Sequence, residues 1–280
     1  MRVDAHQHYW RFDPMRDRWI RDDMDLLRRD FMPGDAAPEV FAEAIDGVVA
    51  VQVDQSEAET DFLLDLAAAH SFVRGVVGWV DLRAPDLGDR LAQWRDRPVL
   101  KGFRHLAQGE PDQFLVQPDV VQGITTLGEH GYSYDLLVYP RQLAAATTLV
   151  GRCPGVRFVL DHCAKPPIAS GEITAWRSGL EELARHPNVY CKVSGLVTEA
   201  HWKRWDHATL VPYLDAVAAL FGPQRLMFGS DWPVCLLAAQ YHEVASVVER
   251  WADQLPSAER ARIFGGTATE VYRLENHDGS

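Results

Sequence analysis

Eight short apolar runs, spread over the whole chain, restrict its fold more than any other feature. They lie at residues 2–8, 47–55, 73–82, 99–106, 132–140, 156–166, 189–196 and 225–233. Between them lie longer segments in which apolar side chains recur at spacings of three and four, as in helices with one buried face. The clearest are residues 60–70, 86–96, 172–186 and 207–221. This alternation predicts repeated βα units and a parallel sheet.

The number and composition of the runs favour a closed barrel. Several runs are almost continuously apolar, as expected for strands that are buried on both faces. Eight such strands with helical crossovers close into a (β/α)8 barrel, for which about 250 residues is a common length. An open doubly wound sheet is the main rival, but no glycine-rich fingerprint follows the first run. We therefore predict an α/β fold, a single (β/α)8 TIM-type barrel domain over residues 1–280, with its active site at the C-terminal ends of the strands.

Charge and composition exclude several classes of partner. The formal net charge is −12 and the sequence contains no cluster of Lys and Arg, so nucleic acid is not an expected partner. No run approaches the roughly 20 apolar residues that span a bilayer, and no apolar signal region precedes His6. The four cysteines form no CxxC pair, which indicates reduced thiols. We expect a cytoplasmic protein with a small-molecule partner and no membrane partner, and the sequence leaves the oligomeric state open.

Polar side chains gather at the predicted C-terminal ends of the runs. His6 and His8 stand in the stretch VDAHQHYW, and because alternate residues of a strand share a face, both imidazoles point the same way. Arg104 ends the fourth run, His162 follows in the sixth and Asp231 in the eighth. A lone histidine is most often a hydrogen-bonded core residue. Together, imidazoles and a carboxylate at one end of a barrel predict a site that holds a metal or moves a proton.

Several motifs in the chain resemble the amidohydrolase superfamily, specifically its branch of lactonase-like barrel hydrolases. They are DAHQH at 4–8, GFRH at 102–105, DHCAKP at 161–166, GSDWP at 229–233 and the closing IFGGTATEVYRL at 263–274. The resemblance implies hydrolysis of a cyclic ester at the barrel mouth. It is closest to the sugar-lactone hydrolases, which implies that a small aldonolactone, of the L-fuconolactone or L-rhamnonolactone kind, is opened to the aldonic acid in carbohydrate catabolism.

The resemblance also implies residue roles and a choice of cofactor. Asp231 matches the general base that activates water. Superfamily members with two metals use a lysine at the end of strand four and a further histidine at strand five. Here the fifth run has no histidine and Lys101 lies toward the wrong end of the fourth, which argues against a binuclear site. Either no cofactor is required, or one divalent metal, with zinc the candidate, is held by His6, His8, His162 and Asp231.

Because the sequence offers fewer metal ligands than the superfamily members with two metals, it slightly favours the alternative without a metal. In that case a cationic donor such as Arg104 would stabilise the oxyanion that develops on the lactone carbonyl, while Asp231 takes the proton of the attacking water. We therefore place His6, His8, Arg104, His162 and Asp231 in the catalytic set.

Further side chains near the predicted mouth suit a sugar ring. Indoles pack against its apolar face, and amides and cations bond its hydroxyls. The expected substrate-binding residues are Trp10, Gln52, Gln55, His105, Lys165 and Trp232. Neighbours in a strand face opposite ways, so parity favours Arg104 over His105 for the barrel interior. The long segment from Trp10 to Pro38, which follows the first run, is expected to shape the site.

Two other functions remain open at this point. A related branch of the superfamily contains metal-dependent decarboxylases of aromatic acids, which need a tightly held metal and an arginine for the carboxylate. A noncatalytic barrel that binds a ligand is the other alternative, and it would not need a poised base such as Asp231.

Overall fold

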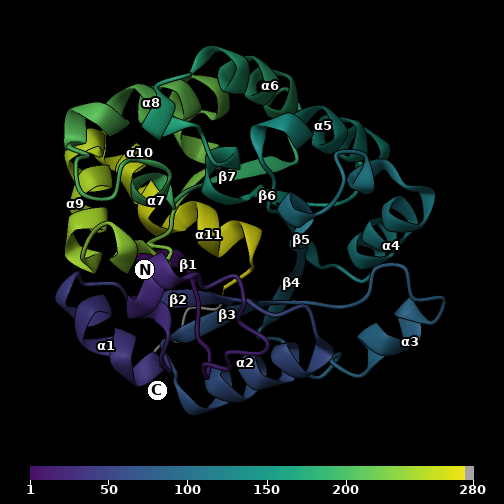
Figure 1. The fold of residues 1–280 in the computed structure, drawn as a ribbon. Coiled ribbons are helices and arrows are strands. Elements are labelled where there is room, and N and C mark those ends of the chain that lie inside the picture. Colours follow the sequence, from purple (N-terminus) through teal and green to yellow (C-terminus); the bar gives the residue numbers. More distant parts are fainter. Residues whose placement is uncertain (275–280) are drawn as a thin grey trace.

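The computed structural model describes residues 1–274, in which eight parallel strands form one sheet in sequence order (Figure 1). The strands are β1 (Val3–Gln7), β2 (Gly47–Val51), β3 (Val73–Gly78), β4 (Leu100–His105), β5 (Ser133–Leu136), β6 (Phe158–Leu160), β7 (Val189–Val193) and β8 (Leu226–Phe228). Each strand pairs in parallel with the next. The predicted (β/α)8 fold class is thereby confirmed.

The first strand and the segment after the last strand close the barrel. The backbone N–H of His8 donates to the carbonyl of Trp232 at 2.7 Å, and the N–H of Asp231 donates to the carbonyl of His6 at 2.9 Å. The buried carboxylate of Asp4 accepts from the backbone N–H of Ser230 at 2.8 Å and from the hydroxyl of Tyr241 at 3.0 Å. This closure sets His6 of β1, and His8 just after it, beside Asp231.

Helices surround the sheet as a ring, with the C-terminal helix lying across its middle in the view of Figure 1. They are α1 (Pro33–Ala42), α2 (Glu57–Ala69), α3 (Leu87–Ala92), α4 (Pro118–Glu129), α5 (Leu143–Arg152), α6 (Thr174–Ala184), α7 (Leu196–Glu199), α8 (His207–Phe221), α9 (Tyr241–Ala252), α10 (Ser257–Ala261) and α11 (Thr267–Val271). The helix predicted over residues 86–96 is therefore shorter than expected. None of the helices within residues 1–274 combines the length and apolarity needed to cross a membrane.

Apolar side chains pack in two layers. The larger lies between the sheet and the helices and includes Trp176 and Tyr241. The smaller joins strand residues such as Val49 and Met227 to Val271 and Tyr272 of the C-terminal segment. Because burial of apolar surface is worth about 25 cal/mol per Å², both layers stabilise the closed barrel.

All the observed strands end before the predicted runs do, and in the sixth and eighth the reason is local backbone geometry. The run at 156–166 was predicted as one strand, but β6 stops at Leu160, and residues 162–165 all have positive φ values. Asp231, three residues after β8, also has a positive φ of 60°. Such φ values are uncommon for residues other than glycine and recur at functional sites. The turns place His162 and Asp231 at the mouth.

Two helical glycines give a direct test of the helix packing. A Cβ at Gly123 in α4 would overlap the carbonyl oxygen of Leu82, whereas a Cβ at Gly88 in α3 would meet nothing within 4 Å. We expect Gly123→Ala to lower the free energy of unfolding by about 1–3 kcal/mol through overpacking. Gly88→Ala, the matched control, should leave it unchanged or raise it by up to about 1 kcal/mol. Urea denaturation checks both, and equal stabilities would contradict the close α4 contact.

Candidate active site

Three histidines and one aspartate meet at the C-terminal end of the barrel. Nε2 of His6 lies 3.1 Å from Nε2 of His8. Oδ1 of Asp231 lies 3.4 Å from Nε2 of His8, 3.8 Å from Nε2 of His6 and 3.8 Å from Nε2 of His162. All four side chains are buried. The structure therefore brings together four of the five residues in the predicted catalytic set around one carboxylate oxygen.

Neighbouring groups fix the outer imidazoles. Nδ1 of His8 lies 2.8 Å from the carbonyl oxygen of Val51 and can only donate there, so Nε2 of His8 presents a lone pair. Nδ1 of His162 lies 2.8 Å from the hydroxyl of Ser194. Gly195 has a φ of 66°, and a Cβ there would come within 2.7 Å of Nδ1 of His162. A glycine at 195 is thus required for His162 to lie at the site.

A buried ion cluster beneath the imidazoles includes residues that sequence reasoning left out of the catalytic set. Nζ of Lys192 lies 2.6 Å from Oδ2 of Asp135 and 3.0 Å from Oδ1 of Asp161. It also lies 3.1 Å from Nδ1 of His6. Lys192 and Asp135 are charged residues inside the predicted apolar strands of β7 and β5. That interruption is the signal that could have identified them.

Arg104, the fifth predicted catalytic residue, is bound into the same cluster. NH1 donates to Oδ2 of Asp161 at 2.9 Å, and NH2 donates to the carbonyl of Gln52. The amide of Gln52 donates in return to the carbonyl of Arg104 at 3.0 Å. NH1 of Arg104 also lies 3.5 Å from Nε2 of His6. Its charge therefore faces the site while most of its donors are already bound.

Burial and neighbouring charges set the protonation of the cluster. Burial, followed by the charge of Lys192, lowers the pKa of His6 well below its usual value. Burial lowers the pKa of His162 to about 4, although the charge of Asp231 opposes the shift. Burial alone would raise the pKa of Asp231, but the neighbouring imidazoles of His162, His8 and His6 hold it below its usual range. At neutral pH, His6 and His162 are neutral and Asp231 is ionised.

His8, His162 and Asp231 line a cavity of about 480 Å³ at the mouth of the barrel. Its walls come mostly from loops, and the indole of Trp19 (38% exposed) and the ring of Tyr139 (39% exposed) reach solvent. The lining residues beyond the cluster are Trp19, Arg21, Met24, Val53, Arg104, Leu106, Gln108, Leu137, Tyr139, Lys165, Thr198, Glu199, Trp202, Val234 and Leu237. Three of them, Trp19, Arg21 and Met24, belong to the segment 10–38 that was expected to shape the site.

Lys165 is the predicted substrate-binding residue that lines this cavity. Its ammonium lies 2.9 Å from the carboxylate of Glu199. Burial opposes the charge, but Glu199 and Asp231 raise the pKa of Lys165, so the ammonium remains protonated. Glu199, which sequence reasoning missed, lies at the end of the short helix α7 and carries no motif that marks it.

The other predicted substrate-binding residues are not among the residues of 1–274 that line this cavity. The indole of Trp10 packs on Phe31 and donates to the carbonyl of Arg29 at 2.9 Å. The ring of Trp232 also packs on Phe31. Because the lining drawn from residues 1–274 includes none of them, direct substrate contact is not supported for Trp10, Gln52, Gln55, His105 and Trp232.

Two of these residues support the site indirectly. The amide oxygen of Gln55 accepts from the backbone N–H of Leu106 at 2.9 Å, which fixes the loop after β4. His105 stacks on Phe114 and lies 3.0 Å from the carboxylate of Glu110, so it faces away from Arg104 as strand parity predicts.

The donor set fits one divalent metal ion. Nε2 of His6, Nε2 of His8 and a carboxylate oxygen of Asp231 lie within 4.8 Å of one another. Two nitrogens on a tetrahedral zinc ion lie roughly 3.3 Å apart, close to the separation of the two Nε2 atoms. Nδ1 of His6 accepts from the ammonium of Lys192 at 3.1 Å, so the neutral imidazole carries its proton on Nε2. Ligation of a metal by Nε2 would require that proton to move to Nδ1, which lies 3.4 Å from Oδ1 of Asp161. This geometry favours a metal more than the sequence did.

Comparison with known proteins agrees with the geometry. Residues 3–274 match the amidohydrolase family. The chain is 46% identical to an L-fucono-1,5-lactonase from Burkholderia multivorans over 98% of this chain and 96% of that protein. It is 39% identical to an L-fucono-1,5-lactonase from Burkholderia ambifaria over 99% of this chain and 97% of that protein. A crystal structure of an amidohydrolase from Burkholderia multivorans with bound zinc superposes with a TM-score of 0.94 at 46% identity, covering 98% of this chain and 100% of that one.

Replacement of the buried lysine tests the ion cluster. We expect Lys192→Met to lower the free energy of unfolding by about 3–5 kcal/mol, because Asp135 and Asp161 would lose a buried cation. Urea denaturation measures the loss, with the exposed Lys203→Met as control. The double variant Lys192→Met/Asp135→Asn should recover part of it, since one carboxylate is then neutralised. A stable single variant would contradict the role of Lys192.

Zinc titration of chelator-treated protein tests the donor set. We expect one Zn²⁺ per chain, and His8→Ala should weaken binding by at least about 100-fold, because even outer partners of a metal site contribute 10–100-fold. His242→Ala, an exposed histidine on α9, is the matched control. Equal zinc affinity of His8→Ala and the wild type would show that the metal lies elsewhere.

Proposed function

The chain belongs to the amidohydrolase family, and on that premise we propose that it is a lactonase that opens the ring of a small sugar lactone to give the aldonic acid. The observation that carries the proposal is the ionised carboxylate of Asp231, which lines the mouth cavity beside the neutral imidazoles of His6 and His162. Such a carboxylate can accept a proton from water. The L-fucono-1,5-lactonase relatives make that lactone the first substrate to examine.

The proposed reaction begins with water between Asp231 and the lactone carbonyl. Asp231 accepts a proton as the water oxygen bonds to the carbonyl carbon, and negative charge develops on the carbonyl oxygen. The charges of Arg104 and Lys165, both on the cavity wall, stabilise it. Collapse of the adduct breaks the ring C–O bond, and Asp231 returns the proton to the departing alkoxide. A divalent metal, when held by His6, His8 and Asp231, supplies Lewis-acid polarisation in addition.

The cavity suits a small sugar derivative of this kind. Aromatic rings of Trp19, Tyr139 and Trp202 lie on its wall and can pack against the apolar face of a sugar ring. The ion pair of Lys165 and Glu199 offers both donors and acceptors to hydroxyl groups. The rest of the wall combines apolar side chains such as Met24, Leu137 and Leu237 with the polar Arg21, Gln108 and Thr198, so it can accept both a methyl group and hydroxyl groups.

We place the reaction in the cytoplasm. All four cysteines are buried free thiols, the state expected in a reducing compartment.

A panel of aldonolactones, followed with a pH indicator, tests the proposal. We expect turnover of L-fucono-1,5-lactone and a loss of about 10²–10⁴-fold in kcat for Asp231→Asn, the usual contribution of a general base. Asp65→Asn, at an exposed aspartate of α2, should retain wild-type activity. If no lactone is turned over, the proposal fails. Release of CO₂ from aromatic acids would then indicate a decarboxylase, and bound but unreacted lactone would indicate a noncatalytic barrel.

A further inference from the structure

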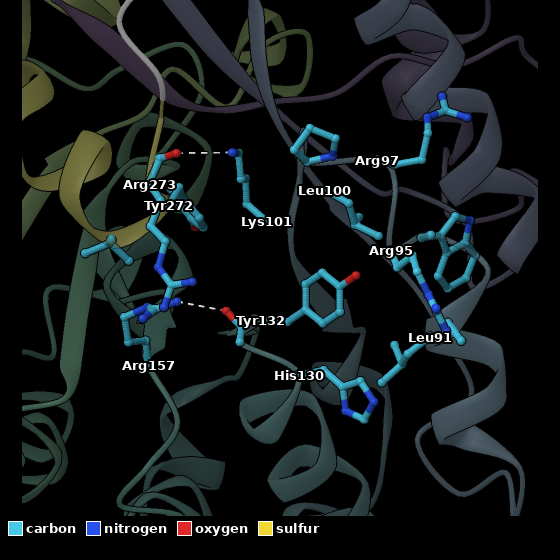
Figure 2. A pocket seen from close by; sticks show the side chains of 15 residues that line it. Leu91, Arg95, Arg97, Leu100, Lys101, His130, Tyr132, Arg157, Tyr272 and Arg273 are labelled. Atoms are coloured by element: carbon cyan, nitrogen blue, oxygen red, sulfur yellow. Dashed lines mark hydrogen bonds between the residues drawn. The ribbon is translucent and has the colours of Figure 1, made fainter.

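Two cavities of the barrel differ in what their lysines contact. In the cavity of about 460 Å³ at the N-terminal ends of the strands, Nζ of Lys101 donates to the backbone carbonyl of Arg273 at 3.1 Å (Figure 2). In the mouth cavity, Nζ of Lys165 donates to a carboxylate oxygen of Glu199 at 2.9 Å. The C-terminal ends of the strands are where a barrel enzyme meets its substrate, so the ion pair at the mouth is placed to contact it.

A left-handed turn brings Lys165 to the mouth cavity. Residues 162–165 all have φ values between 50° and 60°, and the N–H of Lys165 donates to the carbonyl of His162 at 2.8 Å. Side chains three residues apart in a turn of this tightness lie on the same side of it. Both His162 and Lys165 accordingly line the cavity. This conformation is unfavourable for residues other than glycine, and such geometry recurs at functional sites.

The segment that fixes His162 also carries Glu199 to Lys165. The hydroxyl of Ser194 lies 2.8 Å from Nδ1 of His162, and Gly195 precedes the short helix α7 directly beside that ring. Glu199 is the last residue of α7. The loops after β6 and β7 are therefore joined twice, once at the histidine and once at the ion pair. This places the ion pair next to the proposed reaction site.

The ion pair retains hydrogen-bonding capacity for a ligand. Within residues 1–274, Glu199 is the one hydrogen-bond acceptor of the Lys165 ammonium, which has three N–H donors. Over the same part of the chain, Oε1 of Glu199 accepts from Lys165 and Oε2 accepts from no other group. The two side chains are 17% and 22% exposed, so a molecule in the cavity can reach them. A hydroxyl group both donates and accepts, and can bond the two partners at once.

The place of Lys165 in the reaction indicates which hydroxyl this is. In the lactonase reaction proposed above, the ammonium of Lys165 stabilises the developing charge on the lactone carbonyl oxygen, and Asp231 lines the same cavity. An aldonolactone carries a hydroxyl on carbon 2, next to the carbonyl carbon, and the two oxygens lie close together. One ammonium can therefore donate to both oxygens. Glu199 can then accept the hydrogen bond that the hydroxyl donates.

A purely structural role for the ion pair explains less. Lys165 and Glu199 do join two loops, but a partly buried pair loses solvation that its attraction recovers only in part. Apolar side chains would join the loops equally well. A structural role also leaves the left-handed turn and the remaining donors of Lys165 without an explanation, whereas a substrate hydroxyl accounts for both.

On the basis of the proposed lactonase function, we propose that Lys165 and Glu199 bind the hydroxyl on carbon 2 of the lactone, and that Glu199 makes the site specific for 2-hydroxy lactones. A site that is built to bond a hydroxyl group discriminates strongly against a substrate that lacks it, because its polar groups lose water without gaining a partner. Glu199 takes no part in the proposed proton transfers. Its removal should therefore weaken recognition of the hydroxyl more than the chemical steps.

Kinetics with L-fucono-1,5-lactone and its 2-deoxy derivative test the proposal. We expect the wild type to prefer the hydroxylated lactone in kcat/KM by about 10–100-fold, the usual worth of a hydrogen bond to a charged group. Glu199→Leu should abolish this preference by lowering kcat/KM for the hydroxylated lactone far more than for the 2-deoxy lactone. Glu199→Gln, which keeps an acceptor oxygen, should retain part of it. Glu182→Gln, which breaks an exposed ion pair with Arg185, is the matched control and should keep the wild-type preference.

The same comparison separates this inference from the lactonase proposal. Equal losses on both lactones in Glu199→Leu, an unchanged preference in that variant, or a wild type that does not distinguish the two lactones would each overturn the inference alone. A loss that follows the 3-deoxy lactone instead would also overturn it. If the wild type turns over none of these lactones, both proposals fail. Thermal melting identifies a variant that does not fold, and Glu199→Gln then decides by the same ratio of kcat/KM values.

Discussion

The ion pairing of the buried Lys192 is the interaction on which the rest of the barrel depends. Its ammonium contacts the carboxylates of Asp135 and Asp161, and all three side chains are completely buried. An isolated charge at this depth would cost several kcal/mol, so the partners are obligatory. The second oxygen of Asp161 accepts from Arg104, and Asp135 accepts from Tyr272. Strands β4 to β7 and the C-terminal segment are thus joined at one point.

This cluster also determines the chemistry at the mouth. The ammonium of Lys192 faces Nδ1 of His6, which together with burial disfavours a second positive charge on that imidazole. Neutral imidazoles around an ionised Asp231 can hold a cation or accept a proton, whereas protonated ones could do neither. Without the two aspartates, the lysine could not be buried, and without the lysine, their charges would oppose ionisation of Asp231. The ionisation of Asp231 therefore depends on the charge balance of the ion cluster.

The sequence predicted the parts of the site that lie in or directly after strands. His6, His8 and Asp231 follow from strand position and motif, because the C-terminal ends of parallel strands meet at one end of a barrel. Lys192 and Asp135 were not predicted, since one charged residue in an apolar strand reveals its partner only when the strands are arranged in space. Trp10 and Trp232 were expected at the substrate; the structure packs both on Phe31, and their contact with a substrate stays a prediction. Periodicity does not describe the paths of the loops that form the cavity wall.

Strand β4 shows how the two ends of the barrel differ. Lys101 and Arg104 are three residues apart, or about 10 Å along the strand. Arg104 lies toward the C-terminal end, where its guanidinium bonds the buried carboxylate of Asp161 and also lines the mouth cavity. Lys101 lies toward the N-terminal end, where its ammonium donates to the backbone carbonyl of Arg273. One cation of the strand therefore orders the site, and the other holds the C-terminal segment against the opposite end of the barrel.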